Sequence, residues 1–371
     1  MIRTLLSSAA LALVALACNA PPESAATGDA SRPEASSATP TPVELHGALR
    51  VEGTKLVDAC GRPVQLRGVS HFWHTWEGKE HWNEAVAGWL RDDWRVSVIR
   101  APLAAHPDVD GDYLTAPDSS LRQLRDLVEG AIAAGMYVIV DFHAHNRYPT
   151  EAREVLGAIA RDYGDTPNVI YAIWNEPEGT QEPGGPEATW ASIREYAREV
   201  IPAIREHDPD NVVVVPTPFY DQFPDVAAAD RLTADYLGSP VDNIMYDVHA
   251  YAGQHKADVR DRAQAALDAG LPIIMTEVGR VGVDWGPQNK VDSASFDEWL
   301  AWIDANDISY TKWSLSTRDE RSSSLRPGAA AEGGWTDADL TEEGKWNRAH
   351  FRETGEVFYA AEACEEAAGE S

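Results

Sequence analysis

The chain has 371 residues, 44% of them hydrophobic, which is enough for one large folded domain or two ordinary ones. Its 60 acidic residues outnumber its 31 basic residues, and the net charge is −29. This charge argues against nucleic acids and anionic membrane surfaces as partners, because both would repel an acidic surface. We expect the excess of carboxylates to form a solvated acidic surface without a specific partner.

Residues 1–17 have the pattern of a secretory signal peptide, with Arg3 followed by a short apolar stretch that cannot span a bilayer. The stretch ends in Ala15-Leu16-Ala17-Cys18, which resembles a bacterial lipoprotein signal with Cys18 as the lipidated first residue. Ala15 departs from the leucine that is commonest there, and ordinary secretory cleavage nearby is the alternative. We therefore predict an exported protein. It is either a lipoprotein at the cell surface or outer membrane, with Cys18 as a membrane anchor, or an extracellular protein.

Residues 18–42 are expected to form a disordered tether, because they are mostly Ala, Pro, Ser and Thr and cannot bury a core. The folded domain is predicted at residues 43–364, and an acidic tail at 365–371. If Cys18 carries a lipid, Cys60 and Cys364 remain as an even pair in an oxidising compartment. We predict that they form a disulfide that joins the two ends of the domain.

A β-hairpin is predicted at Leu49–Val51 and Lys55–Val57. Eight short apolar runs follow, separated by helical patterns such as Leu121–Ala134 and Trp190–Glu206. The runs are Val64–Val69, Val96–Pro102, Tyr137–His143, Val169–Asn175, Val212–Thr217, Ile244–His249, Ile273–Glu277 and Ser309–Leu315. Eight β-α units without a linker predict a single-domain α/β protein, a (β/α)8 TIM barrel. A doubly wound open sheet is the alternative, but the glycine-rich phosphate loop that such sheets normally carry is missing from the sequence.

Polar residues stand where the predicted strands end, which is the end at which barrel active sites form. The clearest case is the fourth run, which stops at Asn175-Glu176-Pro177 because proline cannot donate to a sheet. The residues at these ends are Arg100, His143, His145, Asn175, Glu176, His249, Tyr251, Glu277 and Trp313. A ring of such side chains around one barrel mouth predicts an active site.

Two glutamates on different strands, Glu176 and Glu277, suit glycoside hydrolysis. That reaction needs one carboxylic acid to protonate the leaving oxygen and a second carboxylate to attack the sugar or to activate water. Flat indole rings stack on sugar faces, so Trp76, Trp174 and Trp313 are candidate binding platforms. Most of the 13 tryptophans are nevertheless expected to fill the core.

A metal centre is the alternative chemistry, because His143 and His145 flank one residue on an extended strand and His249 could add a third ligand. In metal-dependent barrel hydrolases of the amidohydrolase kind, however, the paired histidines stand on the first strand. Here they follow the third, and no lysine that could be carboxylated ends the fourth. We therefore predict that the histidines are hydrogen-bonding groups and that the site needs no metal or cofactor.

The chain resembles the cellulases of glycoside hydrolase family 5, especially bacterial endoglucanases, from Val51 to Phe351. The resemblance rests on these motifs: Leu66-Arg67-Gly68-Val69-Ser70, Trp89-Leu90-Arg91-Asp92-Asp93-Trp94, Val98-Ile99-Arg100-Ala101, Ile139-Val140-Asp141-Phe142-His143-Ala144-His145-Asn146, Ile173-Trp174-Asn175-Glu176-Pro177, His249-Ala250-Tyr251-Ala252-Gly253, Thr276-Glu277 and Trp313-Ser314-Leu315-Ser316. Each motif is weak alone, but their order makes the set specific.

The resemblance implies a retaining enzyme that cleaves internal β-1,4-glucosidic bonds of cellulose or related β-glucans. It implies that Glu176 is the acid/base and Glu277 the nucleophile. It further implies a supporting ring around the central subsite, made of Arg100, His143, Asn175, His249, Tyr251 and Trp313. Arg100 and Tyr251 are expected to hold Glu277 as the anion, and Glu176 is expected to have a pKa raised toward neutrality.

Three positions depart from the family pattern: Val278 stands where tryptophan is usual, Ala172 where glutamate is frequent, and Arg318 where lysine is frequent. Because the loop of Arg318 contacts donor-side sugars in relatives, the substrate preference stays open. The alternatives are a sibling endo-glycanase on mannan, xyloglucan or mixed-linkage glucan, and a non-catalytic glycan-binding barrel. The presence of both glutamates argues against the latter. We expect a monomer.

Overall fold

The computed structural model describes residues 39–177, 189–283, 286 and 288–364. The predicted leader, Cys18, most of the predicted tether and the acidic tail lie outside these residues. The first helix, α1 (Pro42–His46), begins one residue before the predicted start of the domain, and the side chain of Thr41 caps it by accepting a hydrogen bond from the Glu44 backbone N–H. Pro42, the last residue of the predicted tether, is therefore already part of this helix.

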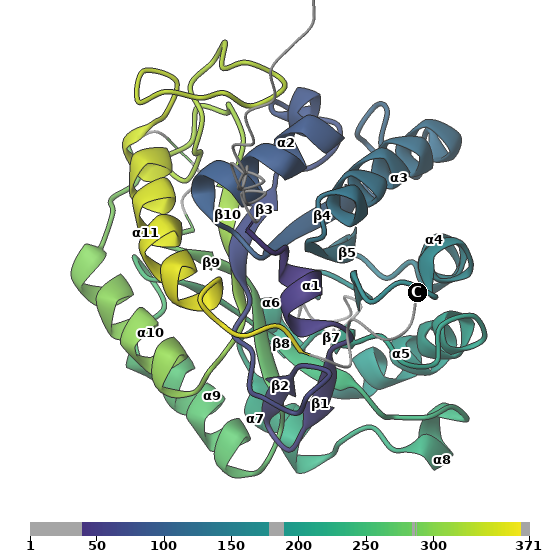
Figure 1. Cartoon of the computed structure of the whole chain (residues 1–371). Helices are drawn as coiled ribbons and strands as arrows, with labels where there is room; N and C mark the ends of the chain where they lie inside the picture. The colour runs from purple at the N-terminus through teal and green to yellow at the C-terminus, as the bar shows by residue number, and fades with distance from the viewer. Residues whose placement is uncertain (1–38, 178–188, 284–285, 287, 365–371) are drawn as a thin grey trace, which may run out of the picture. The chain divides into compact units, whose positions relative to one another are not determined.

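Eight parallel strands close into a barrel, as predicted, in the order β10-β3-β4-β5-β6-β7-β8-β9. The pairing of β10 with both β3 and β9 completes the ring (Figure 1). The strands are β3 (Arg67–His71), β4 (Val98–Ala104), β5 (Tyr137–His143), β6 (Val169–Ala172), β7 (Val213–Val215), β8 (Ile244–Tyr251), β9 (Ile273–Gly279) and β10 (Tyr310–Leu315). All eight overlap the predicted runs, so the (β/α)8 fold is confirmed.

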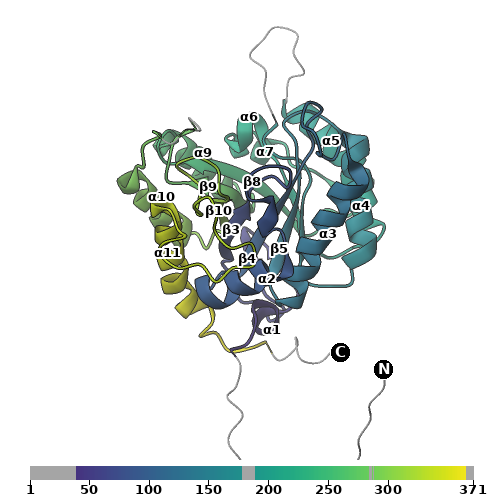
Figure 2. The same cartoon turned by 90° about the horizontal axis from the view of Figure 1, so that it is seen from above.

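Each barrel strand is followed by a helix that packs on the outside of the barrel, and Figures 1 and 2 show these helices around the strands. The main helices are α2 (Glu84–Trp89), α3 (Pro117–Ala133), α4 (Pro149–Tyr163), α5 (Trp190–Arg205), α7 (Pro224–Ala229), α9 (Ala257–Asp268), α10 (Ser293–Ala305) and α11 (Glu342–Phe358). Shorter helical segments are η1 (Lys79–His81), η2 (Leu90–Trp94), α6 (Pro218–Asp221) and α8 (Ala234–Leu237).

The sequence explains several of these boundaries. Prolines stand in the first turn of α3 and α4, where the missing N–H costs nothing, and Thr189 and Thr341 cap α5 and α11 with their side chains. Gly68 of β3 is required by packing, since a Cβ atom there would lie 1.7 Å from the carbonyl oxygen of Val98 on β4. Any larger residue at this position would push the two strands apart.

One end of the barrel is closed by α1 and by the predicted hairpin, β1 (Arg50–Glu52) and β2 (Lys55–Val57). The hairpin is tied to the start of β8, because the Val51 backbone N–H donates to Asn243 Oδ1 at 2.8 Å. The Tyr137 hydroxyl at the start of β5 donates to the Gly47 carbonyl at 2.7 Å. These contacts hold the closing segment against the amino-terminal ends of the strands, opposite the end where barrel active sites form.

Cys60 and Cys364 are disulfide-bonded, as predicted, with Cα atoms 5.9 Å apart and a sequence separation of 304. The Cys364 backbone N–H also donates to the Leu45 carbonyl at 2.9 Å, so the end of the domain lies against α1. The bond therefore joins the first and last described segments at the closed end of the barrel.

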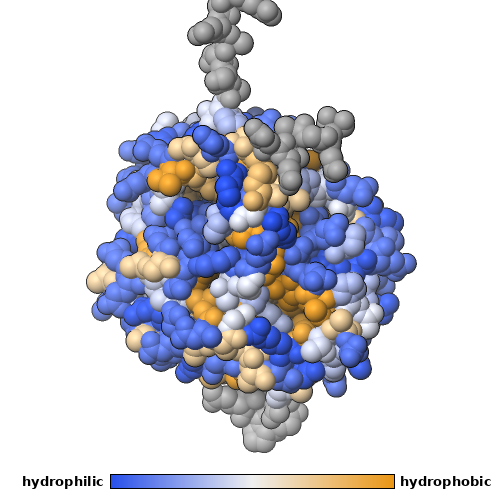
Figure 3. All heavy atoms as spheres, turned by 60° about the horizontal axis from the view of Figure 1, so that its bottom comes forward, coloured by the Kyte–Doolittle hydropathy of each residue, from blue (hydrophilic) through white to orange (hydrophobic). Residues whose placement is uncertain are grey.

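Hydrophilic residues predominate on the face in Figure 3, and apolar residues form only small patches there. Among the described residues, the large hydrophobic side chains that are exposed are Val226 and Val357. In the same part of the chain no helix has the length and apolarity needed to cross a membrane.

Candidate active site

Glu277 lies on β9 with its side chain almost fully buried and fixed by two neighbours. Arg100 Nη1 donates to Glu277 Oε2 at 2.8 Å, and the Tyr251 hydroxyl donates to Glu277 Oε1. Arg100 comes from β4, and Tyr251 ends β8. Three strands thus hold this carboxylate between a cation and a hydroxyl donor, and these are the two contacts predicted for it.

Arg100 contacts several of the buried polar residues beneath the site. It lies within β4 and not at the end of the strand, where it was predicted. Its Nη2 donates to Asn175 Oδ1 at 2.6 Å and pairs with Asp141 at 2.9 Å. His143 Nδ1 donates in turn to Asp141 Oδ2 at 2.7 Å. Burial and the nearby Arg100 charge keep the pKa of His143 well below its usual value, so this ring is neutral.

Glu176 lies in the loop after β6, which ends at Ala172, three residues earlier than predicted. Its backbone has φ +44°, a left-handed conformation that is uncommon outside glycine. Glu176 Oε1 accepts a hydrogen bond of 2.9 Å from His249 Nδ1, while Oε2 lies 3.9 Å from His145 Nδ1. The Glu176 side chain is 15% exposed and faces the pocket.

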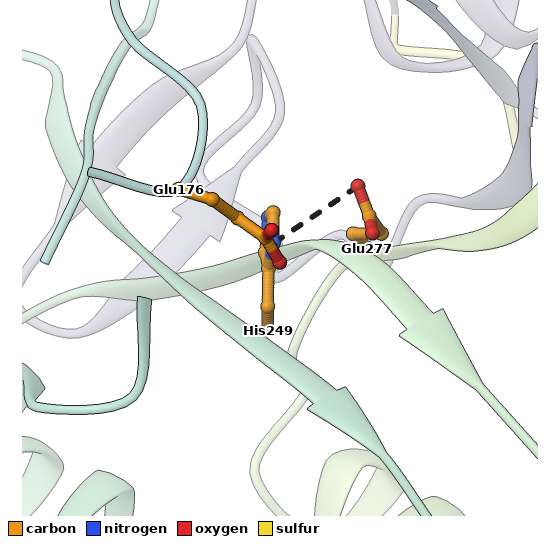
Figure 4. Close-up of side chains that lie close together, drawn as sticks. All are labelled: Glu176, His249 and Glu277. Atoms are coloured by element: carbon orange, nitrogen blue, oxygen red, sulfur yellow. Dashed lines mark hydrogen bonds and ion pairs between the residues drawn. The ribbon is translucent and has the colours of Figure 1, made fainter. Parts of the chain in front are cut away.

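His249 lies behind the two glutamates. Its Nδ1 contacts Glu176 and lies 4.0 Å from Glu277 Oε2, and Figure 4 shows the two carboxyl groups approaching from opposite sides of this histidine. Its Nε2 faces Thr276 Oγ1 at 3.1 Å and Asp247 at 3.4 Å. Burial acts to lower the pKa of His249, but the surrounding carboxylates outweigh it and hold the pKa well above its ordinary value. His249 is therefore a cation in the free protein.

The charge on His249 overturns the expectation of a raised pKa for Glu176. Burial favours the neutral form of Glu176, but the hydrogen bond and charge of His249, with His145 and Arg100, outweigh burial and lower the pKa of Glu176. The expectation considered only the neighbouring anion Glu277 and left out the imidazolium that the fold places at 2.9 Å. The contact with His249 thus favours the charged form of Glu176.

The site opens into a cavity of about 590 Å³ at the carboxyl ends of the strands. Most of the predicted site residues line it, namely Glu176, Glu277, His143, Asn175, Tyr251, Trp313, Trp76 and Arg318. Arg100 and His249 are 1% exposed and sit behind these residues. The fold therefore brings these ten predicted residues together, eight at the cavity wall and two beneath it.

One wall of the cavity is aromatic. Trp73 and Trp76 stack with ring centroids 4.9 Å apart, Phe72 contacts both rings and Trp313, and the Arg318 guanidinium lies 4.3 Å over Trp76. Arg318 is also held by Glu77 and Glu320 at 2.9 and 2.7 Å. Stacked rings and a fixed cation suit the faces and hydroxyl groups of sugar rings.

Sequence reasoning missed Phe72, Trp73, Phe219 and Tyr220, all of which line the cavity. The run of aromatic residues after β3 could have indicated the first two. Trp174, in contrast, is not a platform: it is 4% exposed and stacks on Tyr196 in the core, with ring centroids 4.5 Å apart. Its indole packs on a residue of α5 and is absent from the cavity lining.

Two groups of three side chains in the described part of the chain could hold a metal ion: Glu176 with His249 and Glu277, and Asp221 with Asp247 and His249. In both groups the nitrogens of His249 already have hydrogen-bond partners, and Arg100 already supplies positive charge at Glu277. The histidine set considered from the sequence, with His143 and His145, is not one of these groups. A site without a metal remains a prediction.

Comparisons with known proteins show the family of this chain. The family model for cellulase (glycosyl hydrolase family 5) matches residues 57–319. The chain is 36% identical over 304 residues to an endoglucanase of Clostridium saccharobutylicum, covering 80% of this chain and 63% of that protein. It is 36% identical over 323 residues to endoglucanase 5 of Pectobacterium carotovorum subsp. carotovorum, covering 84% and 59%. The chain thus spans about three fifths of the length of these relatives.

Among solved structures, the catalytic domain of Thermobifida fusca endoglucanase Cel5A superposes with a TM-score of 0.75 at 30% identity, covering 84% of this chain and all of that one. The family match spans well over half of the chain, and the barrel, the two glutamates and their buried partners lie within it or beside it. The chain belongs to glycoside hydrolase family 5, the cellulase family.

Proposed function

We propose that the protein is a retaining endo-β-1,4-glucanase that cleaves internal bonds of cellulose or a related β-glucan. The observation that carries this proposal is the spacing of the two carboxylates, whose nearest oxygens lie within 4.8 Å of each other. Retaining glycosidases have carboxyl groups about 5–5.5 Å apart, whereas inverting enzymes leave room for water at about 6.5–9.5 Å. The short separation supports direct attack by one carboxylate on the sugar.

In the first step, an oxygen of Glu277 bonds to the anomeric carbon as the bond to the leaving oxygen breaks. Glu176 gives its proton to that oxygen, so the shortened chain leaves as a neutral alcohol. Arg100 and Tyr251 hold Glu277 as an oriented anion before attack. Their placement on strands supports Glu277 as the nucleophile.

In the second step, water attacks the anomeric carbon of the glycosyl ester and gives a proton to Glu176, while Glu277 leaves as the carboxylate. Glu176 must therefore carry a proton in one step and lack it in the other. The hydrogen bond to His249 supports this double role, because the pair holds one proton that either group can carry.

Relatives support the substrate class. A variant of the Thermobifida fusca Cel5A catalytic domain was solved in complex with cellotetraose, and the named relatives are endoglucanases. Mannan, xyloglucan and mixed-linkage glucan remain alternative substrates, since Arg318 and the aromatic wall could serve several β-linked backbones. Export, with or without a lipid on Cys18, is part of the proposal and rests on the signal-like sequence of residues 1–17.

Replacement of each glutamate by alanine tests the proposal. Glu277→Ala is expected to abolish cleavage of all substrates. Glu176→Ala is expected to retain the first step on aryl β-cellobiosides with acidic leaving groups, which need no protonation, and azide should then rescue turnover as a β-glycosyl azide.

If azide instead rescues Glu277→Ala and yields an α-glycosyl azide, while Glu176→Ala is inactive on activated substrates, the two roles are reversed. Reducing-end assays of the wild type on a panel of soluble β-glycans would identify the substrate. Inversion of the anomeric configuration in the product would reject the retaining mechanism.

A further inference from the structure

The backbone of Glu176 is held by a residue that sequence reasoning did not single out. The Glu176 N–H donates to Asp221 Oδ2 at 3.0 Å, across 45 positions of sequence. This bond matters because Glu176 stands in a left-handed conformation beyond the end of β6, where no strand partner fixes its direction. A backbone in such a conformation persists only where surrounding contacts hold it.

Asp221 belongs to a second loop, at the end of β7, and is fully buried. Its Oδ1 accepts a hydrogen bond of 2.6 Å from the Thr217 N–H, so one carboxylate bridges the loops that follow β6 and β7. The same loops meet again where the Tyr220 N–H donates to the Pro177 carbonyl at 3.3 Å. Each oxygen of Asp221 thus accepts from one backbone donor on a different loop.

The Asp221 loop is itself strained, because Phe219, Tyr220 and Asp221 all have φ between +56° and +58°. Aspartate adopts this region readily, but phenylalanine and tyrosine rarely do. The strain places the Phe219 and Tyr220 rings at the cavity wall beside Glu176. Strained non-glycine residues of this kind concentrate at functional sites.

We propose that Asp221 is a positioning residue for Glu176: by bridging the two loops, it aims the Glu176 carboxyl at the leaving-group oxygen. This inference rests on the proposed acid/base role of Glu176. An aspartate is required because two N–H groups need two acceptor oxygens. An asparagine would turn an N–H₂ group toward one of these donors and release one loop.

A purely structural role for Asp221 would predict a different result from a positioning role. Loss of structure lowers the activity on every substrate by the same factor. Misplacement of the Glu176 carboxyl relative to the leaving oxygen lowers activity only on substrates whose leaving oxygen must be protonated. The ratio of kcat/KM between two leaving groups within one enzyme preparation separates the two roles, because this ratio does not depend on the folded fraction.

The experiment compares Asp221→Asn with the wild type on a cello-oligosaccharide and on an aryl β-cellobioside with a strongly acidic phenol. The kcat/KM of each reports the first irreversible step, in which Glu176 acts as an acid. We expect Asp221→Asn to lower kcat/KM on the oligosaccharide by about 10- to 100-fold and on the aryl glycoside by less than about threefold.

Asp208 offers a matched control, because it is also fully buried and accepts backbone N–H groups, from Asp210 and Asn211 at 3.2 and 2.9 Å. It precedes β7, at the end of the barrel away from the cavity. Asp208→Asn should lower the midpoint of thermal unfolding and leave the substrate ratio as in the wild type. If Asp221→Asn gives no soluble protein, Asp221→Ser, which is smaller and keeps one acceptor, is measured in the same way.

An equal loss on both substrates, or an unchanged ratio, would overturn the role of Asp221. Failure of the proposed function would look different: Glu176→Ala itself would then fail to discriminate between the two leaving groups. The Glu176→Ala measurement therefore comes first, and the Asp221 variants are compared with it.

Discussion

The two glutamates that we propose as catalytic are held in opposite ways. Glu277 lies within a strand of the barrel, and its partners Arg100 and Tyr251 also come from strands. Glu176 lies in a left-handed loop, and its contacts are a titratable histidine and the side chain of a second strained loop. One carboxylate has a fixed environment, whereas the other has an environment that can change its charge.

This difference matches what the two proposed steps require. A nucleophile must be an oriented anion before attack, and a guanidinium that stays protonated at all working pH values provides that. An acid/base must change its protonation state within each turnover, so a partner that titrates suits it better than a fixed cation. The strained loop adds a hydrogen bond that orients the backbone of Glu176. Substitutions around each glutamate can break or sharpen this contrast.

Loss of Arg100 should be the most damaging change. Arg100→Met leaves Glu277 and Asp141 buried without their cation, so we expect kcat/KM to fall by about 10³-fold and stability to fall by about 3–5 kcal/mol. Activity per folded molecule and urea denaturation measure the two effects. Arg205→Met is the control: Arg205 is also buried but donates to carbonyls at the opposite end of the barrel. It should lower stability and keep kcat.

Removal of His249 should move the pH profile. In the wild type, the last proton of the Glu176–His249 pair leaves at high pH, because the pKa of His249 is raised well above its ordinary value. In His249→Gln, Glu176 alone holds that proton. The alkaline limb of kcat/KM against pH should therefore move to lower pH, and kcat/KM at a fixed alkaline pH should fall about tenfold for every pH unit that the limb moves.

His81 is a matched control for His249, since it is also a fully buried histidine but packs against Trp335, away from both glutamates. His81→Gln should keep the alkaline limb of the wild type. An alkaline limb that stays in place in His249→Gln would mean that the pair does not share its proton, and the contrast between the two glutamates would fail.

The barrel was predictable because strands buried on both faces leave a plain pattern, a continuous apolar run between two helical patterns. The runs beginning at Tyr137 and Val169 show this, and both start where β5 and β6 start. The ends of the strands were less accurate. Val64 and Leu66 are apolar because they pack inside the closed end of the barrel, and burial there does not require a strand.

The identity of the candidate glutamates could be predicted from residue type and position along the chain. Features that depend on contacts between distant segments could not. Glu176 and Glu277 could be singled out, because the apolar runs before them place both carboxylates near the carboxyl ends of barrel strands, where active sites form. Asp221 could not, because no glycine marks the left-handed turn at Phe219–Asp221 and the contacts that hold it come from another loop. The pKa of Glu176 was mispredicted for the same reason: the 2.9 Å contact with His249 exists only in the fold.

A change in the aromatic wall should alter binding and leave both glutamates as they are. Trp76 stacks on Trp73 and lies under Arg318. Its ring contacts do not include Arg100 or His249. Trp76→Ala is expected to raise KM for longer cello-oligosaccharides by about 3- to 10-fold, because one stacking surface is lost. The pH limbs should stay in place. Trp302→Ala, a change on the outer helix α10, should alter neither KM nor the pH limbs.

Reduction of the Cys60–Cys364 disulfide should have the smallest effect on activity, because the bond lies at the closed end of the barrel, away from both glutamates. The bond constrains a loop of more than three hundred residues in the unfolded chain, so its loss should cost about 2–5 kcal/mol of stability. This cost is measured by urea denaturation of the wild type with and without reductant. The double variant Cys60→Ser/Cys364→Ser is measured in the same way. At pH values and temperatures where the reduced protein stays folded, kcat and both pH limbs should match those of the oxidised protein. A shift of either pH limb would mean that the segment closing the barrel affects Glu176 and Glu277, although it lies at the opposite end. The environment of Glu277 would then depend on the disulfide.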